Sequence, residues 1–237
     1  MKITKFDRLY QLTIMPNLFP VNCYLYEEDS ELTLIDTGIS ASFNGIVKLV
    51  EEINKPLTNI VLTHAHGDHV GSLDLLKERF PNAVVSISKR DSRLLGGDFS
   101  LDDLEPKNPI KGGFDKKLKT VPERLLVEGD RIGLLEVIHT PGHTPGSISL
   151  FNPQSRHIIV GDAMQTKGKI AISGQLVPLF PFPMLATWSK EVAVESVKKI
   201  IQLEPTLLAV GHGKIIVNPQ NNIQHAIQVA EKKLVSI

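Results

Sequence analysis

The stretch 63-THAHGDH-69 is the part of this chain from which its organisation can be inferred. It places three imidazoles and one carboxylate within six residues, His64 to His69. The apolar run 60–62 before it predicts a buried strand, and residues 70–76 (VGSLDLL) after it predict the start of a helix. Imidazole nitrogen and carboxylate oxygen together suit zinc, iron and manganese. We therefore predict a metal site at a strand-to-helix turn.

The spacing within this turn divides its side chains between two ions. His64 and His66 are two residues apart on an extended segment, so they point the same way and can bind one ion. Asp68 and His69 are adjacent at the turn and can bind a second ion. Each ion then needs ligands from elsewhere in the chain.

Three later segments supply ligand-type residues, each at the end of a predicted strand and next to glycine or proline. They are His143 in 140-TPGHTPGS-147, Asp162 in 160-VGD-162 and His212 in 210-VGHG-213. A carboxylate can bridge two metal ions, whereas an imidazole normally cannot. The whole set offers seven residues for two ions and leaves room for a bridging water or hydroxide.

Strand and helix signals alternate in blocks along the chain. Strands are predicted at 9–15, 22–26, 32–35, 58–62, 83–87, 124–127, 134–139, 147–151, 157–160 and 207–210. The early ones should pair antiparallel, because their connections are too short for helical crossovers. Helices are predicted at about 42–54, 70–79, 89–95, 187–202 and 219–235, with Ser40 or Ser42 and Asn218 among the N-caps.

The segments 98–120 and 163–186 lack a clear period and predict irregular structure. No linker-like stretch divides the chain. We therefore expect one domain, residues 1–237, in which two packed sheets carry helices on both outer faces.

The composition argues against a dedicated nucleic-acid surface. The chain has 237 residues with 26 basic and 26 acidic side chains, so its formal net charge is zero, whereas nucleic-acid-binding domains usually show a basic excess. The single cysteine, Cys23, excludes an intramolecular disulfide. No export signal is visible, and no run approaches the ~18 apolar residues of a membrane helix. We expect a cytoplasmic protein with a small-molecule substrate and no membrane contact, and a homodimer is an open alternative.

The motifs HAHGDH, PGHTPGS, GD and GH, in this order, resemble those of the metallo-β-lactamase-fold hydrolase superfamily. The resemblance implies an α/β fold, a four-layer αββα sandwich with two mixed sheets flanked by helices. It implies two divalent ions per chain, with zinc as the first choice and iron or manganese as alternatives. The implied ligands are His64, His66 and His143 for one ion, Asp68, His69 and His212 for the other, and Asp162 as the bridge.

A further element, 36-DTG-38, also matches this superfamily. It implies that Asp36 supports a metal-binding histidine through a hydrogen bond. The implied activity is hydrolysis, in which a hydroxide between the two ions attacks the carbonyl of a small lactone, ester or thioester. Asp68 or Asp162 could relay a proton to the leaving group. A phosphodiesterase or nuclease, and a mononuclear iron sulfur dioxygenase of the same fold, are the alternatives.

The substrate-binding wall is predicted in the apolar segment 176–188, which follows Asp162. Its candidate contacts are Phe180, Phe182, Met184 and Trp188. Ordinary core packing or a dimer contact is the alternative for these residues. Small lactonases of the superfamily commonly carry a tyrosine after the bridging aspartate, whereas the tyrosines here all lie within residues 10–26. Either 98–120 or 163–188 could act as a lid or as a contact between subunits.

Overall fold

Short turns between β-rich runs build the first sheet from the N-terminus. In the computed structural model, which describes residues 1–235, strands β1 to β4 pair antiparallel in chain order. Strands β5, β6 and β7 then add to β4 as parallel neighbours. The strands are β1 (Lys2–Phe6), β2 (Leu9–Ile14), β3 (Val21–Glu27), β4 (Leu32–Ile35), β5 (Leu57–Leu62), β6 (Val84–Ser88) and β7 (Arg124–Leu126).

The second sheet forms from the later part of the chain in the order β15-β14-β11-β10-β9-β8. Only the β11–β14 pair is parallel in this sheet. Its strands are β8 (Arg131–Ile132), β9 (Leu135–His139), β10 (Ile148–Phe151), β11 (His157–Ile159), β14 (Leu207–Ala209) and β15 (Ile216–Val217). A small separate ladder joins β12 (Met164–Gln165) and β13 (Ala171–Ile172).

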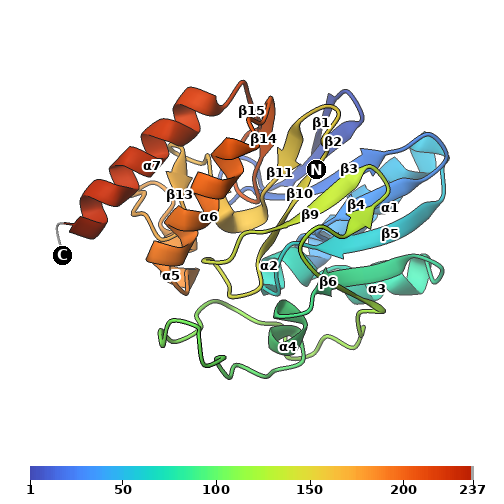
Figure 1. Cartoon of the computed structure of the whole chain (residues 1–237). Helices are drawn as coiled ribbons and strands as arrows, with labels where there is room; N and C mark the ends of the chain where they lie inside the picture. The colour runs from blue at the N-terminus through green and yellow to red at the C-terminus, as the bar shows by residue number, and fades with distance from the viewer. Residues whose placement is uncertain (236–237) are drawn as a thin grey trace.

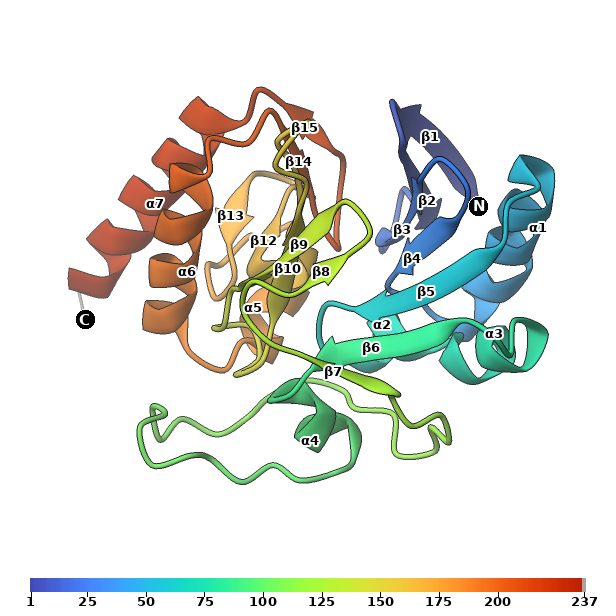
Figure 2. The ribbon, with the colours of Figure 1, turned by 45° about the vertical axis from the view of Figure 1, so that its right-hand side comes forward.

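Helices cover the outer face of each sheet (Figure 1). Helices α1 (Phe43–Ile53) and α3 (Leu73–Arg79) pack on the first sheet, and α6 (Lys190–Gln202) and α7 (Gln220–Val235) pack on the second. Figure 2 shows the four layers from left to right: α7 with α6, the second sheet, the first sheet, and α1 with α3. The predicted arrangement of two mixed sheets flanked by helices is confirmed.

The alternation of side chains along the strands explains this packing. In β3, Cys23 and Leu25 face the helices, whereas Tyr24 and Tyr26 face the second sheet. The apolar cluster between the sheets contains residues from both, such as Val61 of β5 and Leu150 of β10. Burying one such large side chain contributes roughly 1.5–3 kcal/mol, so the two sheets are held face to face mainly by this cluster.

Several predicted boundaries are wrong, because tertiary contacts override local signals. Residues 2–6 were not predicted as a strand, yet they form β1 by pairing with β2. The helix predicted at 70–79 begins only at Leu73, as α3, and the histidine turn itself contains a separate short helix, α2 (Gly67–Val70). The two helices are separated at Gly71, whose N–H donates to the carbonyl of Gly38 at 2.8 Å instead of to a helix carbonyl.

The predicted helix caps also differ from the structure. Ser42 precedes α1 without a capping hydrogen bond from its side chain, and the Ser40 hydroxyl donates to the carbonyl of Gly71. Asn218 has a left-handed φ of +52°, and Pro219 is the residue directly before α7. The Asn218 cap is therefore misplaced by one residue.

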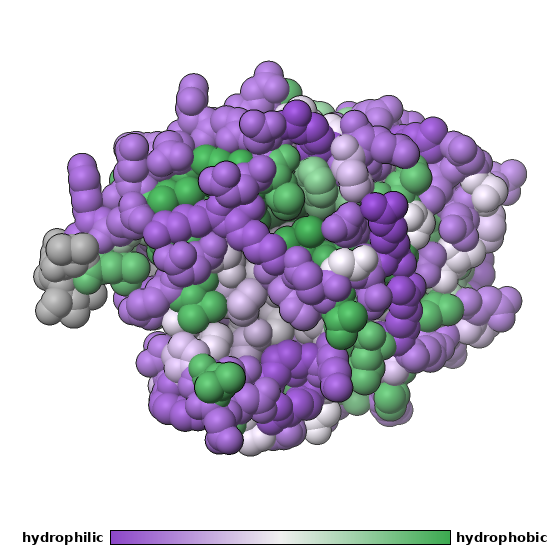
Figure 3. Space-filling model, viewed as in Figure 1, coloured by the Kyte–Doolittle hydropathy of each residue, from purple (hydrophilic) through white to green (hydrophobic). Residues whose placement is uncertain are grey.

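The predicted irregular excursion is present at residues 98–120, below the sheets in the view of Figure 1 and next to α4 (Asp91–Leu95). Figure 3 shows that hydrophilic residues predominate on this face of the molecule and that hydrophobic residues form separate small groups. No helix within residues 1–235 is long and apolar enough to cross a lipid bilayer.

Candidate metal centre

The carboxyl ends of five strands meet at one edge of the sandwich. The turn His64–His69 follows β5, and Asp36 follows β4 in the same sheet. In the second sheet His143 follows β9, Asp162 lies in the short 3-10 helix η2 (Gly161–Ala163) after β11, and His212 follows β14. Strand ends from both sheets therefore deliver all the predicted ligand residues to the same place.

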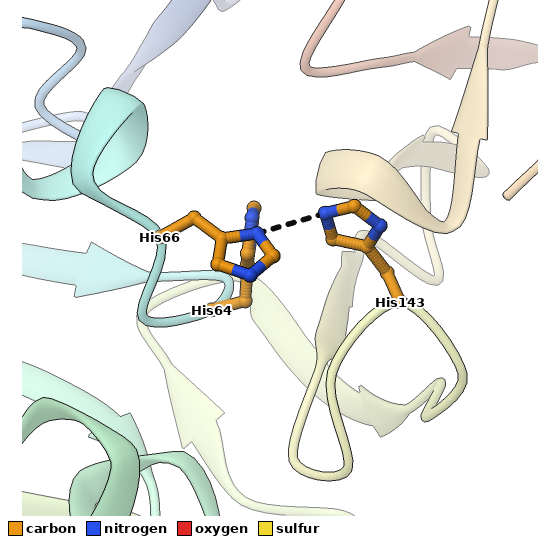
Figure 4. A group of neighbouring side chains, drawn as sticks. All are labelled: His64, His66 and His143. Carbon is orange, nitrogen blue, oxygen red and sulfur yellow. Dashed lines mark hydrogen bonds between the residues drawn. The ribbon is translucent and has the colours of Figure 1, made fainter. Parts of the chain in front are cut away.

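Three overlapping groups of ligand-type atoms occur among the described residues, and within each the candidate atoms lie within 4.8 Å of one another. His64, His66 and His143 make the first group, Asp68, His69 and His212 make the second, and Asp36 with His64 and His69 makes the third. Figure 4 shows the first group, in which His66 Nδ1 and His143 Nε2 are 2.9 Å apart. The first and second groups have the same members as the two ligand sets that the motifs implied, Asp162 apart.

Asp162 lies between the two groups. Its Oδ2 is 3.4 Å from His143 Nε2 and 3.1 Å from His212 Nε2, and its Oδ1 is 3.4 Å from His69 Nε2. One carboxylate thus reaches a histidine of the first group and two histidines of the second. This is the geometry expected of a bridging ligand.

Hydrogen bonds that lead to Asp36 orient the rings of His69 and His64. The Nδ1–H of His69 donates to Asp36 Oδ2 at 2.8 Å. The Thr63 hydroxyl donates to the same carboxylate oxygen at 2.8 Å, so its own oxygen accepts from His64 Nδ1–H at 3.0 Å. Asp36 therefore orients His69 directly and His64 through Thr63, and it leaves both Nε2 atoms free to face the centre.

A second chain of hydrogen bonds orients His143. The hydroxyl of Thr187 donates to the carbonyl of Pro183 at 2.6 Å, so its oxygen accepts from the Ser173 hydroxyl at 2.9 Å. The oxygen of Ser173 then accepts from His143 Nδ1–H at 2.8 Å. Because His143 carries its proton on Nδ1, its Nε2 is unprotonated and its lone pair faces the centre.

Backbone carbonyls orient the remaining two rings. His212 Nδ1–H donates to the carbonyl of Pro20 at 2.7 Å, and His66 Nε2–H donates to the carbonyl of Lys111 at 2.9 Å. His66 therefore presents Nδ1 to the centre, whereas the other histidines present Nε2. The Lys111 contact depends on Gly112, because a Cβ there would lie 2.0 Å from His66 Nε2.

Burial and charge tune the two groups differently. The pKa values of His64 and His66 are lowered, chiefly by burial, and the pKa of His143 is lowered to about 3 for the same reason. These rings stay neutral at physiological pH, which is the form that binds a metal. Burial alone would also lower the pKa of His69 and His212, but neighbouring carboxylates, Asp162 above all, raise both.

Unpartnered polar atoms test whether the residues fit a metal. Three buried atoms, His64 Nε2, His69 Nε2 and Asp162 Oδ1, have no hydrogen-bond partner among the described residues. His69 Nε2 and Asp162 Oδ1 lie 3.4 Å apart without forming a hydrogen bond. An unsatisfied buried polar atom costs about 1–3 kcal/mol, so these atoms call for another partner. Imidazole nitrogens with a carboxylate oxygen are a donor set that divalent metals accept, and the site fits such ions.

A pocket of about 300 Å³ opens onto this centre. Its lining comprises Phe19, His66, Asp68, Gly112, Gly113, His143, Asp162, Phe182, Pro183, Leu185, Ala186 and His212. The apolar part of the wall comes from Phe19 and from helix α5 (Phe182–Ala186). Asp68, with about 31% of its side chain exposed, is more open to the pocket than Asp162, with about 4%.

Only one of the predicted wall residues lines this pocket, namely Phe182. Phe180 is fully buried and stacks behind the wall, with its ring centre 5.2 Å from that of His212. Met184 faces a separate surface pocket on the other side of α5. Trp188 is buried, and its indole N–H donates to the carbonyl of Asn108. These three do not line the pocket, because Phe180 and Trp188 lie on either side of α5 and are buried, and Met184 lies on α5 but lines the other pocket.

Several residues that hold the centre were missed by sequence reasoning. Asn22 Nδ2 donates to the carbonyls of Val210 and Gly213, and the Tyr24 hydroxyl donates to that of Val210 at 2.6 Å. These bonds from β3 fasten the His212 loop to the first sheet. Asn22 lies within a run that reads as an ordinary strand, and no local signal in the sequence distinguishes it.

A buried group of histidines and aspartates at the edge of a two-sheet sandwich defines a protein that can hold divalent metal ions. The family model described as the metallo-beta-lactamase superfamily matches residues 16–212. The chain therefore belongs to the metallo-β-lactamase superfamily and is a metal-dependent hydrolase. This confirms the family predicted from the motifs.

Three relatives in sequence illustrate its place in this superfamily. YobT of Bacillus subtilis (strain 168), described as an uncharacterized protein, is 52% identical over 98% of this chain and 100% of its own length. The probable metallo-hydrolase YflN of the same organism is 32% identical over 81% of this chain and 80% of its own. The hydroxyacylglutathione hydrolase GloC of Haemophilus influenzae is 28% identical over 62% of this chain and 68% of its own length.

Solved structures share the fold. A metallo-β-lactamase from Pontibacter korlensis superposes with a TM-score of 0.73 over 97% of this chain and 98% of its own, at 16% identity. TTHA1623 in a di-iron-bound form superposes with a TM-score of 0.64 over 89% of this chain and 96% of its own, at 27% identity. The predicted metallo-β-lactamase fold is confirmed.

Proposed function

We propose that this chain is a binuclear metal hydrolase that cleaves a small, neutral carboxylic ester, lactone or thioester with an apolar part. The observation that carries the binuclear site is the position of Asp162, within 3.4 Å of histidine nitrogens from both ligand groups. His64, His66 and His143 would hold one ion, and Asp68, His69 and His212 the other. Zinc is the first choice, and the di-iron form of TTHA1623 keeps iron as the alternative.

The chain's own residues support hydrolysis without a side-chain nucleophile. Two bound divalent ions would supply a water of near-neutral pKa and would polarise the substrate carbonyl. Asp68 is the better placed carboxylate to hold the proton of the attacking water and to return it to the leaving oxygen or sulfur, because it is the one more open to the pocket. Asp162, almost fully buried, keeps its charge between the two groups; burial alone would raise its pKa, but His212 and His69 hold it well below the usual range.

The pocket wall argues for a neutral substrate. Among the described residues that line the pocket, none is lysine or arginine, and the far wall consists of phenylalanine, proline, leucine and alanine. A substrate that carries carboxylates would meet no lysine or arginine side chain there. A neutral ester or lactone with a short apolar chain would bury that chain against Phe19 and Phe182. A glutathione thioester, the kind of substrate that the name of GloC implies for that protein, fits this wall less well.

Metal analysis followed by a substrate panel tests the proposal. We expect two ions per chain by elemental analysis, and the highest kcat/KM on neutral acyl esters or lactones. A hydroxyacylglutathione thioester, a chromogenic phosphodiester and a β-lactam should be weaker by at least an order of magnitude. One iron per chain with oxygen consumption on a persulfide would instead identify a sulfur dioxygenase. Preference for the phosphodiester would identify a nuclease-type enzyme.

A further inference from the structure

A buried carboxylate outside the ligand set joins the two main metal-binding segments. Asp91, the first residue of α4, is fully buried, and no ion pair to it occurs within residues 1–235. Its Oδ2 accepts from the backbone N–H of Ala65 at 3.0 Å and from the hydroxyl of Thr144 at 2.7 Å. Its Oδ1 accepts from the N–H of Gly146 at 2.8 Å.

The partners of Asp91 lie directly beside the ligands of the first group. Ala65 lies between His64 and His66, and Thr144 follows His143. One carboxylate thus connects the turn 63–69 of the first sheet with the loop 140–147 of the second. A backbone hydrogen bond also joins the two sheets beside this link, from Ile148 N–H, directly after the loop, to the carbonyl of Thr63 at 2.9 Å. A Cβ at Gly146 would lie 2.4 Å from the Asp91 nitrogen, so the close approach requires glycine there.

The second group has different supports. His69 is oriented by Asp36, and His212 is oriented by Pro20 and fastened through its loop to Asn22. In the described part of the chain Asp91 makes no hydrogen bond to Asp68, His69 or His212, and its contact with the turn 63–69 is at Ala65, between His64 and His66. The direct contacts of Asp91 are therefore next to ligands of the first group, and none is next to a ligand of the second.

The energetics of Asp91 do not favour a purely stabilising role. Burial raises the pKa of its carboxyl to about 6, although the bonds from Thr144, Gly146 and Ala65 partly offset this. At neutral pH the folded chain therefore holds a buried charge that has no ion-pair contact within residues 1–235, although the more distant charge of Arg90 lowers its pKa somewhat, and burying such a charge opposes folding. A residue retained only for stability would be better replaced by a neutral one.

We propose that Asp91 is a positioning residue, which holds His64, His66 and His143 at metal-binding separation by tying Ala65 to Thr144 and Gly146. The inference rests on the proposed function, because it assumes that this group binds an ion. Its specific consequence is that loss of the carboxylate weakens one of two binding events and leaves the other intact. Replacement of a residue that supports a ligand without touching the ion typically lowers metal affinity about 10–100-fold.

The test measures metal affinity directly and does not depend on the substrate. Metal-free protein is titrated with Zn²⁺ in competition with a chromogenic chelator, and with Co²⁺ to record its ligand-field absorption bands. His212→Ala leaves the first group complete, and His143→Ala leaves the second group complete. In the His212→Ala background, Asp91→Asn should lower the remaining affinity about 10–100-fold and change the Co²⁺ bands. In the His143→Ala background it should change the affinity less than twofold.

Two further variants complete the design. Asp103→Asn, on an exposed aspartate of the excursion, is the matched control and should alter neither affinity. Thr144→Val removes a single bond to Asp91 and should weaken the same site by a smaller factor, which keeps the inference testable if Asp91→Asn does not fold. Equal loss in both backgrounds, or no loss in either, would overturn the positioning role while two-ion binding stands. A wild-type chain that binds no divalent ion would overturn the proposed function itself, and this inference with it.

Discussion

The metal centre and the wall of the pocket are built in opposite ways. The centre takes its residues from the ends of strands, buries almost all of them, and fixes each histidine ring by a named hydrogen-bond partner. The wall takes its residues from a loop and a five-residue helix, and Phe182 and Leu185 remain 50% and 60% exposed. The chemistry of the centre can therefore stay the same while substitutions in the wall change the shape of the pocket and the substrate that it accepts. Such substitutions cost the fold little stability.

The largest expected effect comes from the residue that unites the centre. Asp162→Ala should lower kcat/KM more than ~100-fold, because its carboxylate contacts histidines of both groups. Elemental analysis should show fewer than two ions per chain. Full turnover with normal metal content would contradict the bridging role of Asp162. It would also show that the centre tolerates substitution as well as the pocket wall does.

Asp36→Asn should be next in size. Asp36 Oδ1 accepts from the backbone N–H of Thr63, and Oδ2 accepts from His69 Nδ1–H and the Thr63 hydroxyl. An amide has only one acceptor oxygen and must lose bonds on one side, so the orientation of the two ligand rings is weakened. Metal affinity should fall about 10–100-fold in chelator competition. Thr63→Val, which removes only the indirect link to His64, should show a smaller loss. Equal losses in the two variants would contradict the direct role assigned to the Asp36–His69 bond.

The pH dependence of stability gives a smaller effect that is also specific to the centre. The folded pKa of Asp91 is about 6, against an ordinary value of 3.8, so the folded state binds this proton more tightly than the unfolded state. Its contribution to stability is present below pH 3.8 and is lost as the pH rises through about 6. Between pH 4.5 and 7.5 the free energy of unfolding of metal-free wild type, relative to Asp91→Asn, should fall by about 2 kcal/mol.

Urea unfolding of both metal-free proteins at the two pH values measures this difference. Groups shared by the two chains cancel in the comparison, apart from those that contact Asp91. A difference that does not change with pH would show that Asp91 titrates as it does in the unfolded chain.

The smallest effect is expected at the wall. Phe182→Ala should raise KM for an acyl ester about 5-fold and leave kcat and metal content nearly unchanged, because a half-exposed ring contributes about 1 kcal/mol of apolar contact. Met184→Ala, on the same helix but facing away from the pocket, is the matched control and should leave KM unchanged. Phe180→Ala should instead destabilise the fold by about 3–5 kcal/mol, because its ring is fully buried.

The same contrast explains what could be predicted from the sequence. His64, His66, Asp68 and His69 lie in one short motif at a strand end, so spacing alone grouped them, and the structure brings the three distant ligand residues to them. Phe180 and Trp188 flank the short helix α5 and are buried, and Met184 on α5 lines a different pocket. Sequence proximity to Asp162 did not reveal these orientations.

The residues that support the centre were the hardest to foresee. Asp91 and Asn22 come from an unremarkable helix start and an ordinary strand, and they meet the centre only through packing between distant segments. Any residue can supply the backbone partner of such a hydrogen bond. The identity of the partner residue therefore gives no signal in the sequence that the bond will form.

Trp188 gives the wall an internal optical reporter. It is the single tryptophan of the chain, it is buried, and its indole N–H donates to the carbonyl of Asn108 at 3.1 Å. This bond couples the excursion 98–120 to the segment that carries α5. Intrinsic tryptophan fluorescence therefore reports on the contact between these two segments. A red-shifted emission maximum would signal that the segments have separated and that water has reached the indole ring.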